Sequence, residues 1–291
     1  MIISPSAISP YKIPTFQSGG VPFVGLLDLY PSAAAAYSVR RLSGVYSGSL
    51  MEVRRSSDNA LQDIGFDANG DLDTASLLSF VGAGDGFVRT WYDQSGNGND
   101  AQNTTTSTQP KIVSGGSVIL ANSIPNIQFD GVDDYLSADL GSFSTNSSVY
   151  LANFKNFTTG VFAGTYFQLT PTSPNGLGLD KRYLVLGSMS IRNGGSLSTG
   201  DALTIFANHA LFSAIFDGTT VVDVYENNSP VKNRNVSGSS STRYLTIGNW
   251  GDPISSRATR MDISEMIIYN DDNDSRVEGI KNNENTYFSI Y

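Results

Sequence analysis

Beyond residue 100 the sequence consists largely of short segments rich in β-branched and aromatic residues, which pack well on a pleated surface. Glycine, asparagine and aspartate separate these segments, as expected for short strands joined by turns. The segments are 117–120, 126–130, 148–154, 160–169, 182–189, 203–208, 209–217, 220–227, 243–248 and 261–269. The pair Asp217-Gly218 predicts a tight hairpin. With 29 glycines and 11 prolines in 291 residues, the chain is expected to be all-β.

The first hundred residues predict a few further elements. Strands are expected at 50–55 and near 61–66, followed by a helix at about 74–80. The alanine-rich segment AAAAYSVRRL predicts a short helix at about 32–42, because alanine favours helix and the two arginines suit its C-terminus. A last helix is expected after Ser275.

The segment FVRTWYDQSGNGNDA, residues 87–101, runs from a strand into a loop of oxygen-bearing side chains. Trp91 lies within the strand and is expected in the core. The loop offers hard oxygen ligands at alternating spacing, the kind of set that calcium takes. The alternative is an Asx turn, in which these side chains bond their own backbone. The predicted calcium ligands are Asp93, Ser95, Asn97 and Asp100.

Composition excludes several classes of function. The formal net charge of -9 repels phosphate backbones and argues against a nucleic-acid partner. The sequence has no cysteine and a single histidine, His209, so it has no disulfide, no Cys-His site and no multi-histidine zinc site. No apolar run approaches the ~20 residues of a membrane-spanning helix.

The N-terminal region differs in composition from the rest. Residues 1–25 combine four prolines with serine and glycine, which suits an extended arm acting as a linker or an anchor. They show no secretory signal pattern. Residues 26–291 are expected to form a single domain.

Several segments resemble known families. IQFDGVDDYLS at 127–137, HALFSAIFDGTTVVDVYENNSPV at 209–231 and LTIGNW through RMDISEMIIYN at 245–270 are similar to laminin-G-like and concanavalin A-like domains. The region from AYSVRRL to WYDQSGNGNDA resembles the start of the catalytic sandwich of fungal α-L-arabinofuranosidase B, a glycoside hydrolase. Both resemblances imply an all-β, antiparallel concanavalin A-like jelly-roll β-sandwich with a few short helices.

The resemblance also implies which residues catalysis would need. Retaining glycosidases use two carboxyl groups, a nucleophile and an acid/base. The nucleophile of the arabinofuranosidase is a glutamate in mid-domain, yet between Glu52 and Glu226 this chain has none. Asp252 matches the acid/base position with two extra residues before it. Asp180 or Asp201 could replace the nucleophile, which keeps a hydrolase as the alternative.

The loop after the predicted strand 243–248 is a candidate sugar-binding site. Trp250 offers an aromatic face for the C–H side of a sugar, and amide and charged groups beside it suit hydroxyls. The predicted contacts are Trp250, Asn249, Asp252 and Arg257. The alternative is a tryptophan that covers the end of the core.

These observations lead to a functional expectation. We expect a non-enzymatic virion surface protein, of spike, fibre or capsid-decoration type, that binds host cell-surface carbohydrate. Its expected partners are a cell-surface glycan, other virion proteins through the arm, and further copies of itself as a homo-oligomer. The alternatives are an arabinofuranosidase-type glycoside hydrolase with a replaced nucleophile and a purely structural capsid-associated protein. The expected location is the virion surface or, alternatively, the extracellular space.

Overall fold

The structure is a computed structural model that describes residues 22–144, 147–156, 165–170, 182–185, 190–193, 196–198, 210–217, 221–227, 229–235, 241–248, 260–271 and 274–291. Its helices are α1 (Leu26–Leu29), α2 (Thr74–Val81) and α3 (Val277–Phe288), with 3₁₀ turns η1 (Thr106–Thr108) and η2 (Asp274–Arg276). Its strands are β1 (Ala33–Ser38), β2 (Met51–Arg55), β3 (Leu61–Ile64), β4 (Gly86–Trp91), β5 (Ala101–Gln102), β6 (Lys111–Ser114), β7 (Ser117–Val118), β8 (Leu120–Ala121), β9 (Ile124–Pro125), β10 (Ile127–Asp130), β11 (Leu136–Ser144), β12 (Ser147–Asn156), β13 (Thr165–Thr170), β14 (Arg182–Val185), β15 (Ser190–Asn193), β16 (Ser196–Ser198), β17 (Ala210–Asp217), β18 (Val221–Glu226), β19 (Ser229–Asn235), β20 (Ser241–Ile247) and β21 (Arg260–Tyr269).

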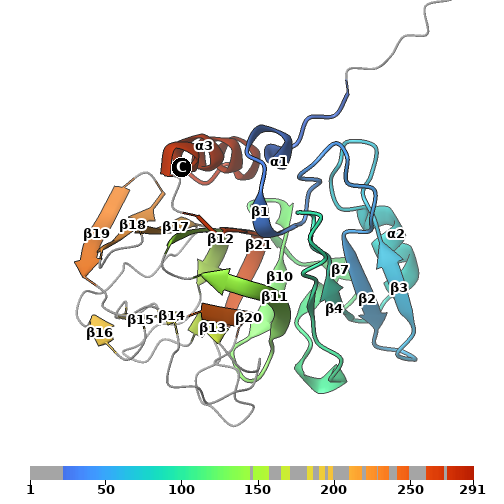
Figure 1. The fold of residues 1–291 in the computed structure, drawn as a ribbon. Helices are drawn as coiled ribbons and strands as arrows, with labels where there is room; N and C mark the ends of the chain where they lie inside the picture. Colours follow the sequence, from blue (N-terminus) through green and yellow to red (C-terminus); the bar gives the residue numbers. More distant parts are fainter. Residues whose placement is uncertain are drawn as a thin grey trace, which may run out of the picture.

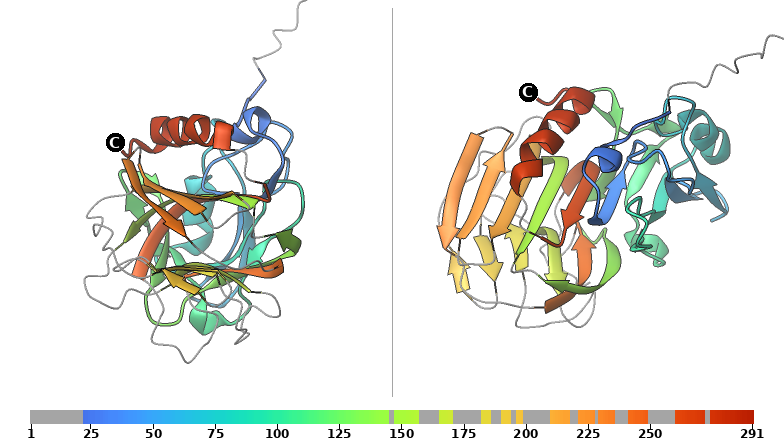
Figure 2. Two further views of the ribbon diagram at one scale, coloured as in Figure 1. Left: turned by 60° about the vertical axis from the view of Figure 1, so that its left-hand side comes forward. Right: turned by 45° about the horizontal axis from the view of Figure 1, so that its top comes forward.

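The strands form two packed layers (Figures 1 and 2). The first runs β19-β18-β17-β12-β21, and β1 and β10 share the other edge of β21. The second runs β16-β15-β14-β13-β20-β11-β5-β4-β2-β3. Strand β6 pairs with both β10 and β4 and so joins the layers. All these pairings are antiparallel, which confirms the predicted β-sandwich.

Strand β21 is buried on both faces. Met266 and Ile268 point into the core between the two layers. Ile267 and Tyr269, on the opposite face by strand alternation, belong to a second apolar cluster that includes residues of α1 and α3. Helix α3 covers this outer face of the first layer (Figure 2, left).

Several predicted elements are confirmed. The helix at 74–80 is α2, and Asp73 caps it by accepting a hydrogen bond from the Ser76 backbone N–H at 2.9 Å. Strands β17 and β18, which flank the hairpin expected at Asp217-Gly218, pair antiparallel. Trp91 is fully buried, as expected. Among the described residues, no helix is long and apolar enough to span a membrane.

The helix predicted at 32–42 is wrong, because its first half is strand β1. Ala33–Ser38 pairs with β21, and Ala35 and Ala36 are fully buried. The helix preference of alanine over other ordinary residues is less than about 1 kcal/mol per residue. Strand pairing and burial against two apolar clusters outweigh it. The strand predicted at 203–208 lies outside the described residues.

Candidate functional site

A row of polar side chains crosses the outer face of the second layer. Met51, Trp91 and Leu136 in three of these strands are buried in the core, so their sequence neighbours Glu52, Thr90 and Ser137 face outward. Strand register makes each member of the row the direct neighbour of the next. In order from β3 to β20, this polar row consists of Asp63, Glu52, Thr90, Gln102, Ser137 and Thr246.

Ionic and hydrogen-bonded contacts organise one end of the polar row. The Arg89 guanidinium forms an ion pair with Glu52. The Tyr92 hydroxyl donates to Asp63 Oδ1 at 2.7 Å. Burial and this hydrogen bond raise the pKa of Tyr92. Tyr92 is therefore a neutral donor at physiological pH, and Arg89 is neutralised by a partner carboxylate.

A cavity of about 350 Å³ opens over the polar row. Glu52 and Arg89 contribute from β2 and β4, and Gln102 from β5. Asn99 and Asp100 come from the loop after β4, and Asp139 comes from β11. Burial and the nearby Asp93 charge raise the pKa of Asp100, against the backbone hydrogen bond that it accepts from Asp93. The lining thus combines carboxylates, amides, a guanidinium and a phenol.

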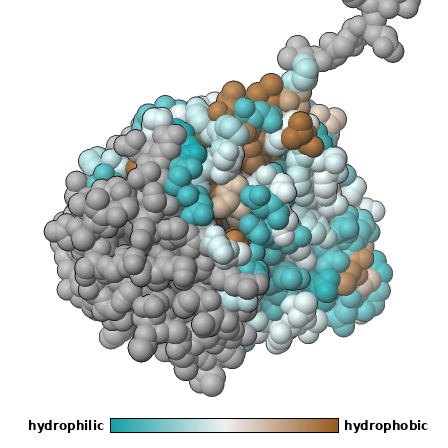
Figure 3. Space-filling model, viewed as in Figure 1, coloured by the Kyte–Doolittle hydropathy of each residue, from teal (hydrophilic) through white to brown (hydrophobic). Residues whose placement is uncertain are grey.

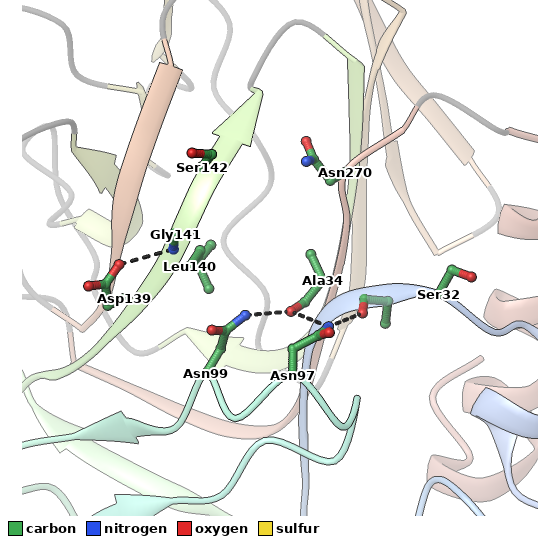
Figure 4. A pocket seen from close by; sticks show the side chains of 10 residues that line it. Ser32, Ala34, Asn97, Asn99, Asp139, Leu140, Gly141, Ser142 and Asn270 are labelled. Atoms are coloured by element: carbon green, nitrogen blue, oxygen red, sulfur yellow. Dashed lines mark hydrogen bonds between the residues drawn. The ribbon is translucent and has the colours of Figure 1, made fainter.

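A second cavity, of about 740 Å³, adjoins the first and shares Asn99 and Asp139 with it. Figure 4 shows Asp139 on β11 facing Asn99 of the loop, with Asn270 farther along the opposite wall. Asp139 Oδ1 accepts a hydrogen bond from the Gly141 backbone N–H at 3.0 Å. The two cavities therefore meet at a polar boundary.

The loop predicted to bind calcium is held by its own hydrogen bonds. Asp93 Oδ1 accepts from the backbone N–H groups of Ala36 at 2.8 Å and Ser95 at 2.9 Å. Asp93 Oδ2 accepts from the Ser95 hydroxyl at 2.7 Å and the Asn99 N–H at 3.0 Å. Asp100 Oδ1 accepts from the Asp93 N–H at 2.9 Å. A calcium ion would have to compete with these donors, and calcium binding stays a prediction.

The Asn97 side chain, also among the predicted ligands, fixes the loop to β1. Its Nδ2 donates to Ala33 O at 2.9 Å and Ala34 O at 3.1 Å. Asn99 Nδ2 also donates to Ala34 O, at 2.8 Å (Figure 4). The structure thus brings Asp93, Ser95, Asn97 and Asp100 together, as the sequence pattern suggested, in the Asx-type arrangement.

A different group of carboxylates comes together after β10. Oxygens of Asp130, Asp133 and Asp134 lie within 4.8 Å of one another and could hold a cation. They also shape a turn, since Asp134 Oδ2 accepts from the Asp130 N–H at 2.9 Å and Asp130 Oδ1 from the Val132 N–H at 2.7 Å. Burial raises the pKa of Asp134 to about 7, and the charges of Asp130 and Asp133 add to this shift.

Gly248 directly follows strand β20 and lies next to this turn. Its φ of 92° lies in the left-handed region, and a Cβ there would stand 2.2 Å from Phe129 Cδ1 and 2.9 Å from Asp134 O. Glycine is therefore required at this position. The predicted sugar contacts Asn249, Trp250, Asp252 and Arg257 follow it in sequence but lie outside the described residues. So do Asp180, Asp201 and His209.

Sequence reasoning singled out Asn97 and Asp100, as calcium ligands, but missed most of the other residues that line the two cavities. Glu52, Tyr92, Gln102 and Asp139 are far apart in the sequence and meet only through strand register. The alternation in Met51-Glu52-Val53 could have indicated that Glu52 faces outward. No local signal identifies its neighbours across the sheet.

Comparison with known proteins supports the glycosidase part of the resemblance. The model of the family described as alpha-L-arabinofuranosidase B, catalytic, matches residues 28–136, less than half of the chain. No curated protein matches the sequence. The matches bring no support for a laminin-G-like domain or a virion origin.

Solved structures share the fold. A GH54 α-L-arabinofuranosidase soaked with a cyclic sulfate inhibitor has a TM-score of 0.69 at 16% identity. An arabinofuranosidase complexed with arabinofuranosyl-α-1,2-xylobiose has a TM-score of 0.64 at 16% identity. Each match covers 89% of this chain and 64% of the other. The chain thus spans less than two thirds of the length of these enzymes.

These findings correct the expectation of a non-enzymatic virion surface protein. The matched family model describes a catalytic domain, and the structural neighbours with the same sandwich are arabinofuranosidases. The absence of a glutamate from mid-domain was too narrow a basis for excluding an enzyme, because aspartate can supply the same carboxyl group. The chain therefore has the fold of the GH54 arabinofuranosidase β-sandwich and, over residues 28–136, sequence similarity to the arabinofuranosidase B catalytic domain.

Proposed function

We propose that this protein is a glycoside hydrolase of arabinofuranosidase type, which cleaves α-L-arabinofuranosidic bonds. The observation that carries the proposal is the match of residues 28–136 to a catalytic-domain family. The shared fold over 89% of the chain is consistent with it. Hydrolysis of a polymeric glycan suits an extracellular location.

The proposed chemistry needs two carboxyl groups. In the retaining mechanism one carboxylate attacks the anomeric carbon while a carboxylic acid protonates the leaving oxygen, and water then releases the sugar. We assign the acid/base role to Asp252, four residues after Gly248. Asp180 or Asp201 takes the place of the missing glutamate nucleophile.

The described end of β20 supports this assignment of Asp252. Leu245 and Ile247 are fully buried, and the space at Gly248 admits no side chain. The segment that carries Asp252 therefore starts from a tightly packed point of the scaffold. A catalytic group needs such support, because small displacements from productive geometry cost large factors in rate.

The experiment measures release of 4-nitrophenol from 4-nitrophenyl α-L-arabinofuranoside. Asp252→Asn is expected to lower kcat by at least about 100-fold, the usual contribution of a general acid. Asp180→Asn or Asp201→Asn, whichever removes the nucleophile, should abolish turnover. Azide should restore turnover with retained configuration in the acid/base variant and give the inverted glycosyl azide in the nucleophile variant.

The matched control is Asp58→Asn, which makes the same change of charge at an exposed carboxylate paired with Arg55 at the β2–β3 turn. Its kcat should equal that of the native chain. Unchanged activity in Asp252→Asn would disprove the acid/base assignment, and a native chain without activity would contradict the proposed function.

A further inference from the structure

Two strand pairings connect the floor of the cavity over the polar row to β20, the strand that leads to the proposed catalytic loop. Gln102 pairs with Ser137, and Ser137 pairs with Thr246 of β20. Strand β20 ends one residue later, at Ile247, and Gly248 follows it. The polar row thus connects the cavity floor, through adjacent strands, to the strand that carries the catalytic loop.

The volume and location of the cavity suit a small ligand. At about 350 Å³ it lies at the lower end of the range of about 300–1,000 Å³ for small-molecule sites. Its floor is built on paired strands rather than on a mobile loop. Its rim, Asn99 and Asp100, is tied to β1 and to Asp93 by hydrogen bonds. These supports give a preorganised site.

The lining favours a neutral polyol. Carboxylates of Glu52, Asp100 and Asp139 outnumber the one guanidinium, that of Arg89, which disfavours an anionic ligand. Amide groups of Gln102 and Asn99 supply further donors and acceptors. All lining residues except Gly98 have polar side chains, which disfavours an apolar ligand, and the described surface seen in Figure 3 is mainly hydrophilic.

A sugar matches this set of groups better than a cation does. The half-buried Tyr92 lines the cavity, and an aromatic side chain can pack against the C–H side of a sugar. Within the described ranges, the three carboxylates that approach one another closely enough to share an ion are Asp130, Asp133 and Asp134. None of them lines this cavity.

We propose that the cavity lined by Glu52, Arg89, Tyr92, Asp100, Gln102 and Asp139 is a subsite that binds one sugar unit of an oligosaccharide. It holds a unit of the chain to which the cleaved arabinofuranosyl group is attached. This orientation rests on the proposed function, whereas sugar binding itself does not. The adjoining cavity of about 740 Å³ shares Asn99 and Asp139 with this subsite, and Gln102 does not line it. It has room for the next sugar unit of the oligosaccharide.

The test is isothermal titration calorimetry with arabinofuranosyl-α-1,2-xylobiose and, separately, with free arabinose. Binding is measured in the Asp252→Asn background, so that the trisaccharide stays intact. Because the cavity adds contacts beyond the arabinosyl unit, the trisaccharide should bind at least about 10-fold more tightly than arabinose. Gln102→Ala and Asp139→Asn should each weaken trisaccharide binding by about 10-fold, the equivalent of one or two lost hydrogen bonds.

Three controls make the result specific. Asp58→Asn, outside the cavity, should bind the trisaccharide like its parent. The melting temperatures of Gln102→Ala and Asp139→Asn should equal that of their parent, because Gln102 and Asp139 are exposed. Tyr92→Phe retains the ring and removes the hydroxyl, so it should weaken binding less than Tyr92→Ala does.

The subsite and the proposed function can fail separately. An active native enzyme whose trisaccharide affinity is unchanged in Gln102→Ala and Asp139→Asn would overturn the subsite and leave the hydrolase intact. An inactive native chain that binds the trisaccharide through these residues would retain the subsite and overturn the hydrolase. No binding of the trisaccharide at millimolar concentration would overturn the subsite.

Discussion

At the scale of single residues, Asp93 shows how one side chain fixes the region around the cavities. It is 4% exposed and accepts four hydrogen bonds, from Ala36 of β1 and from Ser95 and Asn99 of its own loop. It therefore joins the first layer of the sandwich to the loop that ends at β5. Its carboxylate holds the Asn99 backbone at the cavity rim, and its backbone N–H holds the Asp100 carboxylate there.

Replacement of Asp93 by alanine should destabilise the protein strongly. Three backbone N–H groups would lose their acceptor, the buried one of Ala36 and the partly buried ones of Ser95 and Asn99, and a buried group left without a partner costs about 1–3 kcal/mol. We expect the free energy of unfolding, measured by urea denaturation, to fall by at least about 3 kcal/mol. Asp58→Asn serves as the control and should leave the free energy of unfolding nearly unchanged, because this carboxylate is exposed. A loss below 1 kcal/mol in Asp93→Ala would contradict the role given to Asp93.

The same samples test the calcium prediction. An ion held by this loop stabilises only the folded state, so millimolar calcium chloride should raise the Tm of the native chain. The rise should vanish in Asp93→Ala. An equal Tm with calcium chloride and with a chelator would contradict calcium binding at Asp93 and Asp100.

At the scale of elements, helix α3 packs on the sheet over a buried charged cluster. The Arg40 guanidinium binds Glu265 of β21 through two hydrogen bonds, at 2.8 and 2.9 Å, and the Ser38 hydroxyl donates to Glu265 at 2.6 Å. Arg40 also stacks on the Tyr287 ring of α3, 4.5 Å from its centroid. Glu284 of α3 is fully buried beside this group, and neither of its carboxylate oxygens accepts a hydrogen bond.

Glu284 should make stability depend on pH. Burial and the charge of Glu265 raise its pKa well above the ordinary value of 4.5, against the attraction of Arg40. The folded state therefore holds this proton more tightly than the unfolded chain does. The contribution of Glu284 is fully present below about pH 4.5 and is lost as the pH rises toward its folded-state pKa.

Glu284→Gln should remove this dependence, because an amide needs no proton to stay neutral and can donate to Glu265. At pH 8 we expect the variant to be at least about 1 kcal/mol more stable than the native chain, and at pH 4 about equal to it. Urea denaturation at both pH values measures the difference. Glu278→Gln, an exposed change on the same helix, is the control. A stability gain that is equal at both pH values would contradict the assigned titration.

The elements differ in how far the sequence could predict them. Local signals were sufficient for α2, which Asp73 caps, and for the β17–β18 hairpin at Asp217-Gly218. They failed for β1, where burial and pairing with β21 outweigh the helix preference of alanine. They could not find the polar row, because residues such as Glu52 and Ser137 become neighbours only through the register of several strands.

At the scale of the whole molecule, the two layers of the sandwich are joined through β6 and enclose a common core. The polar row lies on the outer face of the second layer. The sequence resemblance predicted this sandwich, since its strand patterns are local. The functional expectation was wrong, because the missing glutamate was given more weight than the resemblance of residues 36–101 to the catalytic sandwich of an arabinofuranosidase. The candidate acid/base, Asp252, was proposed from its place after the strand that ends just before Gly248.

The most direct test of the account is the release of arabinose by the native chain. Incubation with arabinofuranosyl-α-1,2-xylobiose, followed by proton NMR, should show free arabinose and xylobiose, with arabinose first appearing as the anomer that retains the configuration of the substrate. The Asp252→Asn variant should leave the trisaccharide intact over the same time. A native chain that leaves both this trisaccharide and 4-nitrophenyl α-L-arabinofuranoside unchanged would contradict the account.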